Sequence, residues 1–380
     1  MKITALYDGW PLIHSPFSPA AQHLLTILAF LPEQVEPVIA LPGQAPNLRL
    51  DIPRRIHLAR ATPLGRLIWV HRVMPWLARL TRAHLIHLTT PTAPVFGRTA
   101  SLVSPAGYDL DFGLDNNIEP SYARRQSRNT RRGFIDRVGA SLAHGGVVRA
   151  QAVLWPSDLP TPKLSVRLIK IPPIVHLGFS IAGDDQVGEL RTQLAAVDLP
   201  ETYVLYHGPA DLTTLKHLVD AWSWAAGPIG EYYPLLVLGL DSSGQQCINQ
   251  LAHALDLGNT LRVIAHRDPA LIPAIYLGCT ALLHPAPVSP WDGAVRQALA
   301  CGKPVVAFDE PVTSAMAGPA AYLTTSSDAR AMAAALITVV VEEEVANNLS
   351  RAAQKRAADW RSNSFAGELS RIYQDMFAAL

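Results

Sequence analysis

The chain has 380 residues, of which 49% are hydrophobic, so it is long and apolar enough for two ordinary domains and is not a single small module. Its 32 lysine and arginine residues almost balance 31 acidic residues, and the net charge of +1 excludes a global attraction to nucleic acid or to an anionic membrane. The three cysteines lie far apart in apolar stretches, which indicates free thiols in a reducing compartment and neither a disulfide framework nor a zinc site.

The N-terminal residues MKITALYDGWPLIHSP contain one lysine and a short strand-like run, and they lack the long apolar segment of a signal peptide. No stretch reaches the roughly 18 uninterrupted apolar residues expected of a membrane-spanning helix. The sequence therefore predicts a soluble, cytoplasmic protein. Peripheral contact with the inner face of the membrane stays open.

Short apolar runs alternate with helix-length segments along the whole chain. In order they are ITALYDG, PVIAL, LIHLTT, SLVSP and AVLWPS, followed by YVLYHG, LLVLG, RVIAH, ALLHPA and PVVAFD. Runs that are apolar on both faces and separated by helices are typical of parallel strands covered by helices on both sides. The pattern predicts doubly wound α/β domains.

A polar stretch between about Gly178 and Leu199 separates the two sets of runs and predicts a linker. We expect a first domain over residues 1–180 and a second over residues 181–363. The last segment, residues 364–380, has apolar residues at helical spacing and predicts an amphipathic helix.

Two basic segments of the first domain leave alternatives open. Residues 65–84 combine apolar residues at helical spacing with several arginines. This segment predicts either a helix on its own sheet, kinked at Pro75, or a surface for a membrane or a partner. Residues 121–137 hold six arginines and predict either a solvated helix face or a site for an anionic lipid or phosphorylated carrier. The six are Arg124, Arg125, Arg128, Arg131, Arg132 and Arg137.

The segment LHPAPVSPWDGAVRQALACGKPVVAFD, from Leu283 to Asp309, resembles the donor-site segment of family 4 (group 1) glycosyltransferases. YVLYHGPADLTTLKHLVDAW resembles the unit that opens the second domain of these enzymes, and SLVSPAGYDLDF resembles a segment of the first. This resemblance covers nearly the whole chain. It implies the glycosyltransferase-B fold, in which two Rossmann-like doubly wound domains face a cleft and the C-terminal helix completes the first, acceptor-side domain.

The resemblance also implies retaining transfer of a hexose from a nucleotide diphosphate sugar, which is a co-substrate and not a cofactor. Cations and backbone amides would hold the diphosphate. Family members carry an arginine and a lysine where this chain has Pro209 and Thr213, with Lys216 further along the same helix. They carry two glutamates eight residues apart where this chain has Ser289 and Gln297. Gln297 can still hydrogen-bond a diol, without the strength of a charged carboxylate.

The start of the donor-site helix departs from the family pattern as well. Asp292 and Gly293 lie there, and we expect the Asp292 carboxylate to cap the helix amides that a diphosphate would use. The expected donor-binding set comprises Gly208, Thr213, Lys216, Ser289, Asp292, Gly293 and Gln297.

In the first domain, Tyr108 stands before Asp109 at the place where the family carries its active-site histidine. These two residues are the expected catalytic pair, although tyrosine is a poor proton carrier at neutral pH. The first loop has Ser15, Pro16 and Phe17 where family members have adjacent glycines, which favours a rigid connector.

Three hypotheses follow from these substitutions. The first is an active transferase acting on a glycan, lipid or small acceptor. The second is a catalytically inactive homologue that binds or regulates a partner glycosyltransferase subunit. The third, a sugar-nucleotide epimerase, lacks an assignable set of acids and histidines. No histidine pair has the spacing of a zinc helix. His207 at a strand end predicts either a ligand contact or an ordinary hydrogen-bonded histidine.

Overall fold

The computed structural model describes residues 2–44, 51–107, 146–175, 199–264, 271–325, 328–360 and 362–378. The chain divides into two compact units. Unit 1 comprises Met1–Ile174, Ser289–Trp291 and Ser362–Leu380, and unit 2 comprises Val175–Val288 and Asp292–Arg361. The expected domain boundary at residue 180, and all of the expected linker except its last residue, lie outside the described residues.

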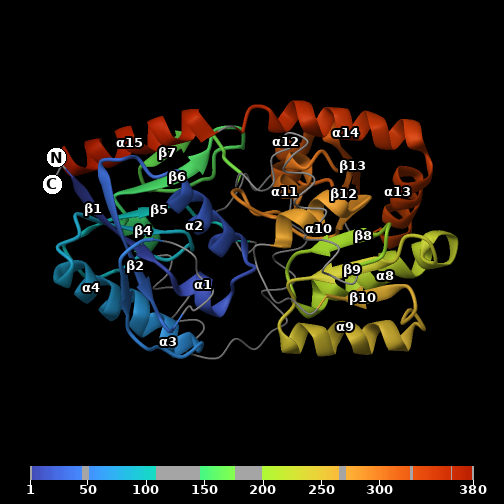
Figure 1. Ribbon diagram of the computed structural model, residues 1–380, viewed down its shortest axis with the longest axis horizontal. Coiled ribbons are helices and arrows are strands. Elements are labelled where there is room, and N and C mark those ends of the chain that lie inside the picture. Colours follow the sequence, from blue (N-terminus) through green and yellow to red (C-terminus); the bar gives the residue numbers. More distant parts are fainter. Residues whose placement is uncertain are drawn as a thin grey trace. The chain divides into compact units, whose positions relative to one another are not determined.

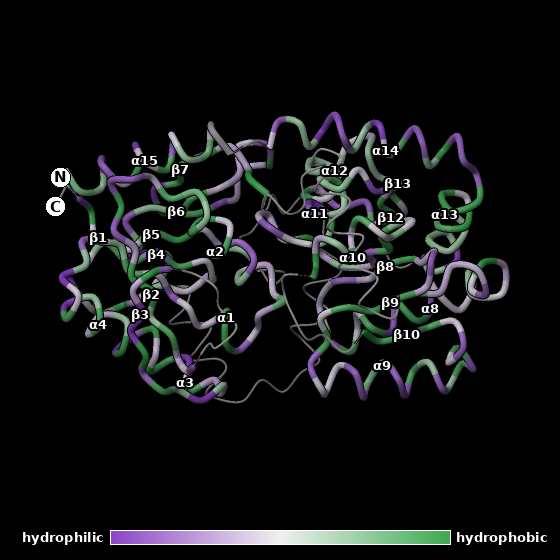
Figure 2. Tube along the Cα trace, in the orientation of Figure 1, coloured by the Kyte–Doolittle hydropathy of each residue, from purple (hydrophilic) through white to green (hydrophobic). Residues whose placement is uncertain are grey.

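The described residues of unit 1 form a seven-stranded sheet of order β3-β2-β1-β4-β5-β6-β7, and every pair of neighbouring strands is parallel (Figure 1). The strands are β1 (Ile3–Asp8), β2 (Val35–Leu41), β3 (Arg54–Ile56), β4 (Leu85–Leu88), β5 (Ala100–Val103), β6 (Ala152–Pro156) and β7 (Leu168–Ile171). Figure 2 shows that the central strands are hydrophobic along their length, as strands buried on both faces require.

Helices cover both faces of this sheet. Alternate residues of β1 separate the faces, because Ala5 and Tyr7 belong to one core cluster and Leu6 to the other. The first cluster includes buried residues of α2 (Pro19–Ala29) and α15 (Ser362–Ala378). The second includes the helix that follows β3. The short α1 (Trp10–His14) comes directly after β1.

The helix over residues 63–80 contains a π turn. It begins at α3 (Pro63–Ile68), where the Thr62 hydroxyl accepts a hydrogen bond from the Gly65 amide. The next five residues, Trp69–Val73, form the π turn, and α4 (Met74–Leu80) follows. Proline lacks an N–H and its ring crowds the preceding turn, so the wider turn accommodates Pro75. The kink expected at Pro75 is therefore a π turn within one helix.

A buried polar network joins α15 to the sheet of unit 1. The Tyr373 hydroxyl lies 2.9 Å from the Tyr7 hydroxyl and 2.6 Å from His87 Nδ1, and His87 Nε2 lies 2.9 Å from the Ser104 hydroxyl. Burial lowers the pKa of His87 to about 3, with a further contribution from nearby His23. Burial also raises the pKa of Tyr7 and Tyr373. These groups therefore stay neutral near pH 7.

The described residues of unit 2 form a six-stranded parallel sheet of order β10-β9-β8-β11-β12-β13. The strands are β8 (Val204–His207), β9 (Leu235–Leu238), β10 (Leu261–Val263), β11 (Ala281–His284), β12 (Val305–Phe308) and β13 (Ala321–Thr324). The described helices are α8 (Leu212–Ile229), α9 (Ser242–Ala254), α10 (Ile272–Gly278), α11 (Ala294–Ala300), α12 (Pro311–Ala317), α13 (Ala329–Val341) and α14 (Glu343–Ala357), with a 3₁₀ turn at Gly318–Ala320. α8 packs against α9 and α13, and α11 packs against α12 and α14.

Each sheet has one point where the strand order reverses. In unit 1 it lies between β1 and β4, and in unit 2 between β8 and β11. Ligands of open α/β sheets bind beyond the carboxyl ends of the strands at such points. The prediction of two doubly wound parallel sheets is confirmed, and the two reversal points are the places to look for a site. No described helix is long and apolar enough to cross a lipid bilayer.

Candidate functional sites at the two strand-order reversals

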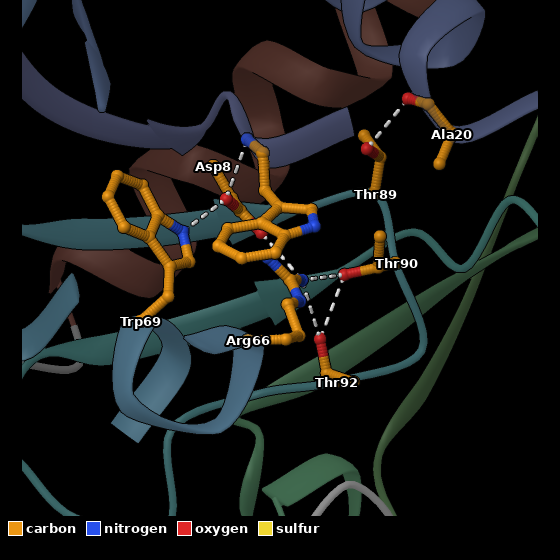
Figure 3. A network of polar contacts seen from close by, with 8 residues as sticks. Asp8, Ala20, Arg66, Trp69, Thr89, Thr90 and Thr92 are labelled. Atoms are coloured by element: carbon orange, nitrogen blue, oxygen red, sulfur yellow. Dashed lines mark hydrogen bonds and ion pairs between the residues drawn. The ribbon is translucent and has the colours of Figure 1, made fainter. Parts of the chain in front are cut away.

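Unit 1 carries a buried carboxylate at its reversal point. Asp8 is the last residue of β1 and has no exposed surface. Its Oδ1 atom accepts hydrogen bonds from Trp69 Nε1 at 2.8 Å and from the Trp10 amide at 3.0 Å (Figure 3). Its Oδ2 atom lies 2.8 Å from Arg66 Nη2. A buried charge needs such partners, so this arrangement fixes the start of α1 and the side of α3 against the sheet.

Arg66 links this carboxylate to the loop that follows β4. Its Nη2 atom donates to the Thr90 hydroxyl at 2.6 Å and to the Thr92 hydroxyl at 3.0 Å (Figure 3). Its guanidinium carbon lies 5.2 Å from the centroid of the Trp10 ring. Within the described ranges, the buried Nη1 atom of Arg66 has no hydrogen-bond partner. The Nη1 atom is therefore available to donate a hydrogen bond to another group.

His14, at the end of α1, stands near this guanidinium. Burial lowers the pKa of His14, and the charge of Arg66 lowers it further, whereas a hydrogen bond to the Ala59 backbone raises it. Its buried Nε2 atom accepts no hydrogen bond from any described residue. The Trp10 and His14 ring centroids are 4.3 Å apart. Among the described residues, one nitrogen of neutral His14 and one of the charged Arg66 guanidinium thus lack hydrogen bonds in the same region of unit 1.

We expect Asp8→Asn to destabilise unit 1 by about 2 kcal/mol, because it leaves Arg66 without its countercharge. We take a value below that of a fully buried pair because the Arg66 side chain is 18% exposed. Urea unfolding measures the loss. Glu36→Gln removes one partner of the exposed Lys2–Glu36 pair in the same sheet and should change the free energy of unfolding little. Equal effects of the two substitutions would contradict a stabilising role for the buried pair.

The reversal point of unit 2 is filled by aromatic side chains. The Tyr206 hydroxyl donates to the Pro209 carbonyl at 2.6 Å, and His284 Nε2 lies 3.2 Å from the Pro287 carbonyl. A Cβ at Gly208 would lie 2.8 Å from the Tyr206 hydroxyl and 3.1 Å from His284 Cε1. Gly208 therefore keeps a position that no side chain can occupy without a shift of its neighbours. Burial lowers the pKa of His284 to about 4.

His207, which the sequence favours for this edge, is buried, and its Nδ1 atom lies 2.8 Å from the Tyr276 hydroxyl. The second interpretation, an ordinary hydrogen-bonded histidine, fits this position.

An aspartate that the sequence analysis missed caps α8, the first described helix of unit 2. The Asp211 carboxylate accepts hydrogen bonds from the Thr213 amide at 3.1 Å and the Thr214 amide at 3.0 Å. Both Thr213 and Lys216 are exposed on α8. The amides at the start of α8 are thus taken by a carboxylate and are not available to a bound anion. This cap could have been predicted from the sequence, because an aspartate directly before a helical pattern is a strong N-terminal cap.

The donor-site segment begins its helix at a glycine. α11 starts after its N-cap residue Gly293, which has no side chain to cap the helix, and capping by the preceding Asp292 stays a prediction. Gly293 has an extended backbone, and the Asp292 side chain before it is fully buried. The neighbouring Arg296 is buried as well, with its guanidinium carbon 4.5 Å from the centroid of the Trp360 ring.

The two positions that replace the family glutamates fall in different units. Ser289 belongs to unit 1, and Gln297, on α11, belongs to unit 2. Ser289 is 2% exposed and Gln297 0%. Within the described part of the chain, neither the Ser289 hydroxyl nor the Gln297 amide has a hydrogen-bond partner. Buried polar groups are normally satisfied, so each of these two is a candidate for a ligand contact.

Of the expected donor-binding residues, Gly208, Thr213, Lys216, Asp292, Gly293 and Gln297 lie in unit 2. The expected catalytic pair, Tyr108 and Asp109, and the arginines of residues 121–137 lie outside the described residues. No group of three or more histidine, cysteine, aspartate or glutamate side chains within the described ranges can hold a metal ion.

Residues 211–356 match the family model described as Glycosyl transferases group 1. No curated protein sequence matches the chain significantly. Among solved structures, a sucrose-phosphate synthase from Thermosynechococcus elongatus is similar over 100% of both chains, with a TM-score of 0.71 and 17% identity. Anabaena HepE in complex with UDP-glucose is similar over 100% of both chains, with a TM-score of 0.65 and 16% identity.

A third solved structure, an alpha,alpha-trehalose-phosphate synthase from Burkholderia vietnamiensis, covers 100% of both chains with a TM-score of 0.61 and 11% identity. At these identities the likeness concerns the fold alone. The chain therefore has the glycosyltransferase-B fold, and residues 211–356 match a group 1 glycosyltransferase domain.

Proposed function

We propose that the protein transfers a hexose from a nucleotide diphosphate sugar to a glycan, lipid or small acceptor, with retained configuration. The observation that carries this proposal is the match of residues 211–356, in the unit expected to hold the donor, to the group 1 glycosyltransferase model. The unpaired amide of Gln297 supports it, because a ribose diol offers both donors and acceptors to an amide. HepE, a protein of the same fold, is known in complex with UDP-glucose.

The acceptor belongs to unit 1 in this proposal. Among the described residues, the donor Arg66 Nη1 and the acceptor His14 Nε2 have no hydrogen-bond partner. A hydroxyl group can accept from the first and donate to the second, which suits a sugar or polyol. Because Asp8 neutralises Arg66, a neutral hydroxyl fits this region better than an anion. The same proposal includes a peripheral contact with a membrane.

Transfer with retention is tested by incubating the protein with α-linked UDP- and GDP-sugars and a set of sugar and polyol acceptors. Nuclear magnetic resonance of the anomeric protons follows the product. We expect an α-linked product, and we expect Tyr108→Phe and Asp109→Asn to slow its formation about 100-fold or more. Lys2→Gln, an exposed substitution, serves as the control. A β-linked product would contradict retention.

A second candidate is a catalytically inactive homologue that binds or regulates a partner glycosyltransferase subunit. Two observations favour it. The Asp211 carboxylate occupies the amides at the start of α8, where a diphosphate would need positive charge. Asp292 and Gln297 are both fully buried in unit 2. This candidate predicts that neither nucleotide binding nor transfer will be detected.

A further inference from the structure

One side of the helix over residues 63–80 exposes large apolar side chains. Leu64, Ile68, Trp76 and Leu80, here called the apolar stripe, are 53%, 47%, 51% and 59% exposed. They recur at multiples of four residues, and Arg72, also exposed, occupies the remaining place in the series. The opposite side packs on the sheet through Trp69, Val73 and Leu77, which are buried. The helix thus has apolar residues on both its inner and its outer side.

The π turn keeps the apolar stripe straight. On a regular α-helix, residues spaced by four drift steadily around the axis because a turn holds 3.6 residues. A π turn holds more residues, so the turn at Trp69–Val73 offsets this drift between Ile68 and Trp76. The apolar stripe therefore runs along one side from α3 to α4.

Two neighbouring loops extend this surface. The His57 ring lies 5.8 Å from the Trp76 ring, and the next residue, Leu58, is 77% exposed. A Cβ at Gly97 would lie 3.3 Å from the Pro75 Cβ, so the chain at Phe96 passes beside α4. Phe96 is 65% exposed. Exposed apolar groups that gather in this way mark an interaction site.

The surrounding sequence carries almost only positive charge. Residues 51–107 contain eight arginines, one aspartate, and no lysine or glutamate. The arginines are Arg54, Arg55, Arg60, Arg66, Arg72, Arg79, Arg82 and Arg98, and the acid is Asp51. Arg72 and Arg79 are exposed on the same helix as the apolar stripe. Although the chain as a whole is nearly neutral, residues 51–107 therefore form a strongly basic segment.

The combination of exposed apolar side chains with arginines fits one kind of partner best. A second copy of the chain in a symmetric contact would place this basic surface against itself, which like charges oppose. A nucleic acid would match the arginines but would leave the four apolar side chains in water. An anionic lipid bilayer takes both, because apolar side chains enter the acyl region and arginines meet the headgroups.

We propose that the apolar stripe docks unit 1 on an anionic lipid bilayer, with the helix over residues 63–80 lying in the plane of the interface. This inference gives the membrane contact of the proposed function a place on unit 1. It does not depend on transferase activity, because no nucleotide or acceptor takes part in the contact.

Cosedimentation of the full chain with vesicles tests this docking. Vesicles contain phosphatidylcholine with or without phosphatidylglycerol. We expect binding to the anionic vesicles only, with affinity falling as salt is added. The double variant Trp76→Ser/Leu80→Ser should bind at least tenfold more weakly. Arg72→Gln and Arg79→Gln should each weaken binding to the anionic vesicles about fivefold. All four side chains are exposed, so the variants should fold normally.

Trp224→Ser is the matched control, since Trp224 is a 55%-exposed tryptophan of unit 2. It should leave vesicle binding unchanged. An equal loss of binding in this control, or no binding to anionic vesicles at low salt, would overturn the proposal. So would a dimer that Trp76→Ser/Leu80→Ser converts to a monomer. Calorimetry with UDP on the same variants separates the questions, because failure of nucleotide binding leaves the vesicle result standing.

Discussion

Acidification from pH 7 to pH 4.5 should lower the free energy of unfolding of unit 1 by about 3 kcal/mol through His87 alone. The folded-state pKa of His87 is about 3, below the ordinary value of 6.5. As pH falls through 6.5, the unfolded chain takes up a proton that the folded chain refuses. The stabilisation is therefore complete above pH 6.5 and declines by about 1.4 kcal/mol for each pH unit down to the folded pKa.

The measurement is the free energy of unfolding from urea titrations between pH 7 and pH 4.5. His87→Asn should flatten the dependence by about 1.4 kcal/mol per pH unit, because asparagine does not titrate. His284, with a folded pKa of about 4, adds a similar dependence in unit 2. A wild-type stability that is constant over this range would contradict the burial of neutral His87.

Gln297→Leu should stabilise the free protein and weaken its binding of nucleotide sugars at the same time. The Gln297 amide is fully buried, and no described residue forms a hydrogen bond with it. An unsatisfied buried amide costs about 1–3 kcal/mol, and leucine of similar volume removes this cost. If the amide binds the ribose hydroxyls of the donor, its removal should also weaken nucleotide binding about tenfold.

Calorimetry with UDP and GDP measures the affinity, and thermal unfolding measures the stability. Gln354→Leu changes an exposed glutamine of α14 in the same unit and should leave the affinity unchanged. A Gln297→Leu variant with wild-type affinity would show that this position does not hold the donor. A variant that is less stable than the wild type would show that the amide has a partner in the protein.

The central strands could be predicted from the sequence, whereas three of the four edge strands could not. All ten apolar runs overlap strands, and most of these strands lie inside their sheets, where burial on both faces requires apolar residues. β3, β7 and β13 were missed. Each lies at the edge of its sheet and is only partly buried, so its sequence carries no continuous apolar run.

The helix over residues 63–80 shows a limit of periodicity. Its apolar residues Trp69, Val73, Trp76, Leu77 and Leu80 predicted one apolar side, either packed on the sheet or open to a membrane or a partner. Trp76 and Leu80 face solvent in the structure, because apolar residues recur on two sides of this helix. A sequence pattern reports how often apolar residues recur, and only the packing shows which side meets the sheet. The irregularity at Pro75 could be predicted because the geometry of proline acts within one turn.

The site residues also divide into those that local sequence could predict and those that only the packing shows. Asp8 ends an apolar run, so an acid at the carboxyl edge of a strand could have been read from the sequence. Its partner Arg66 lies 58 residues further along the chain, and no local rule pairs them. Family spacing pointed to Ser289 and Gln297, yet it could not show that these positions belong to different units. The donor-binding residues and the catalytic pair Tyr108 and Asp109 stay predictions.

The most direct test of a donor site in unit 2 is calorimetric titration of the wild-type full chain with UDP, GDP and their sugars. The proposed function predicts saturable binding of one nucleotide with one site per chain, and tighter binding of the nucleotide than of inorganic pyrophosphate. Absence of binding by every nucleotide at millimolar concentration, in protein that is folded by circular dichroism, would contradict it. That result would favour the inactive homologue whose partner is another protein.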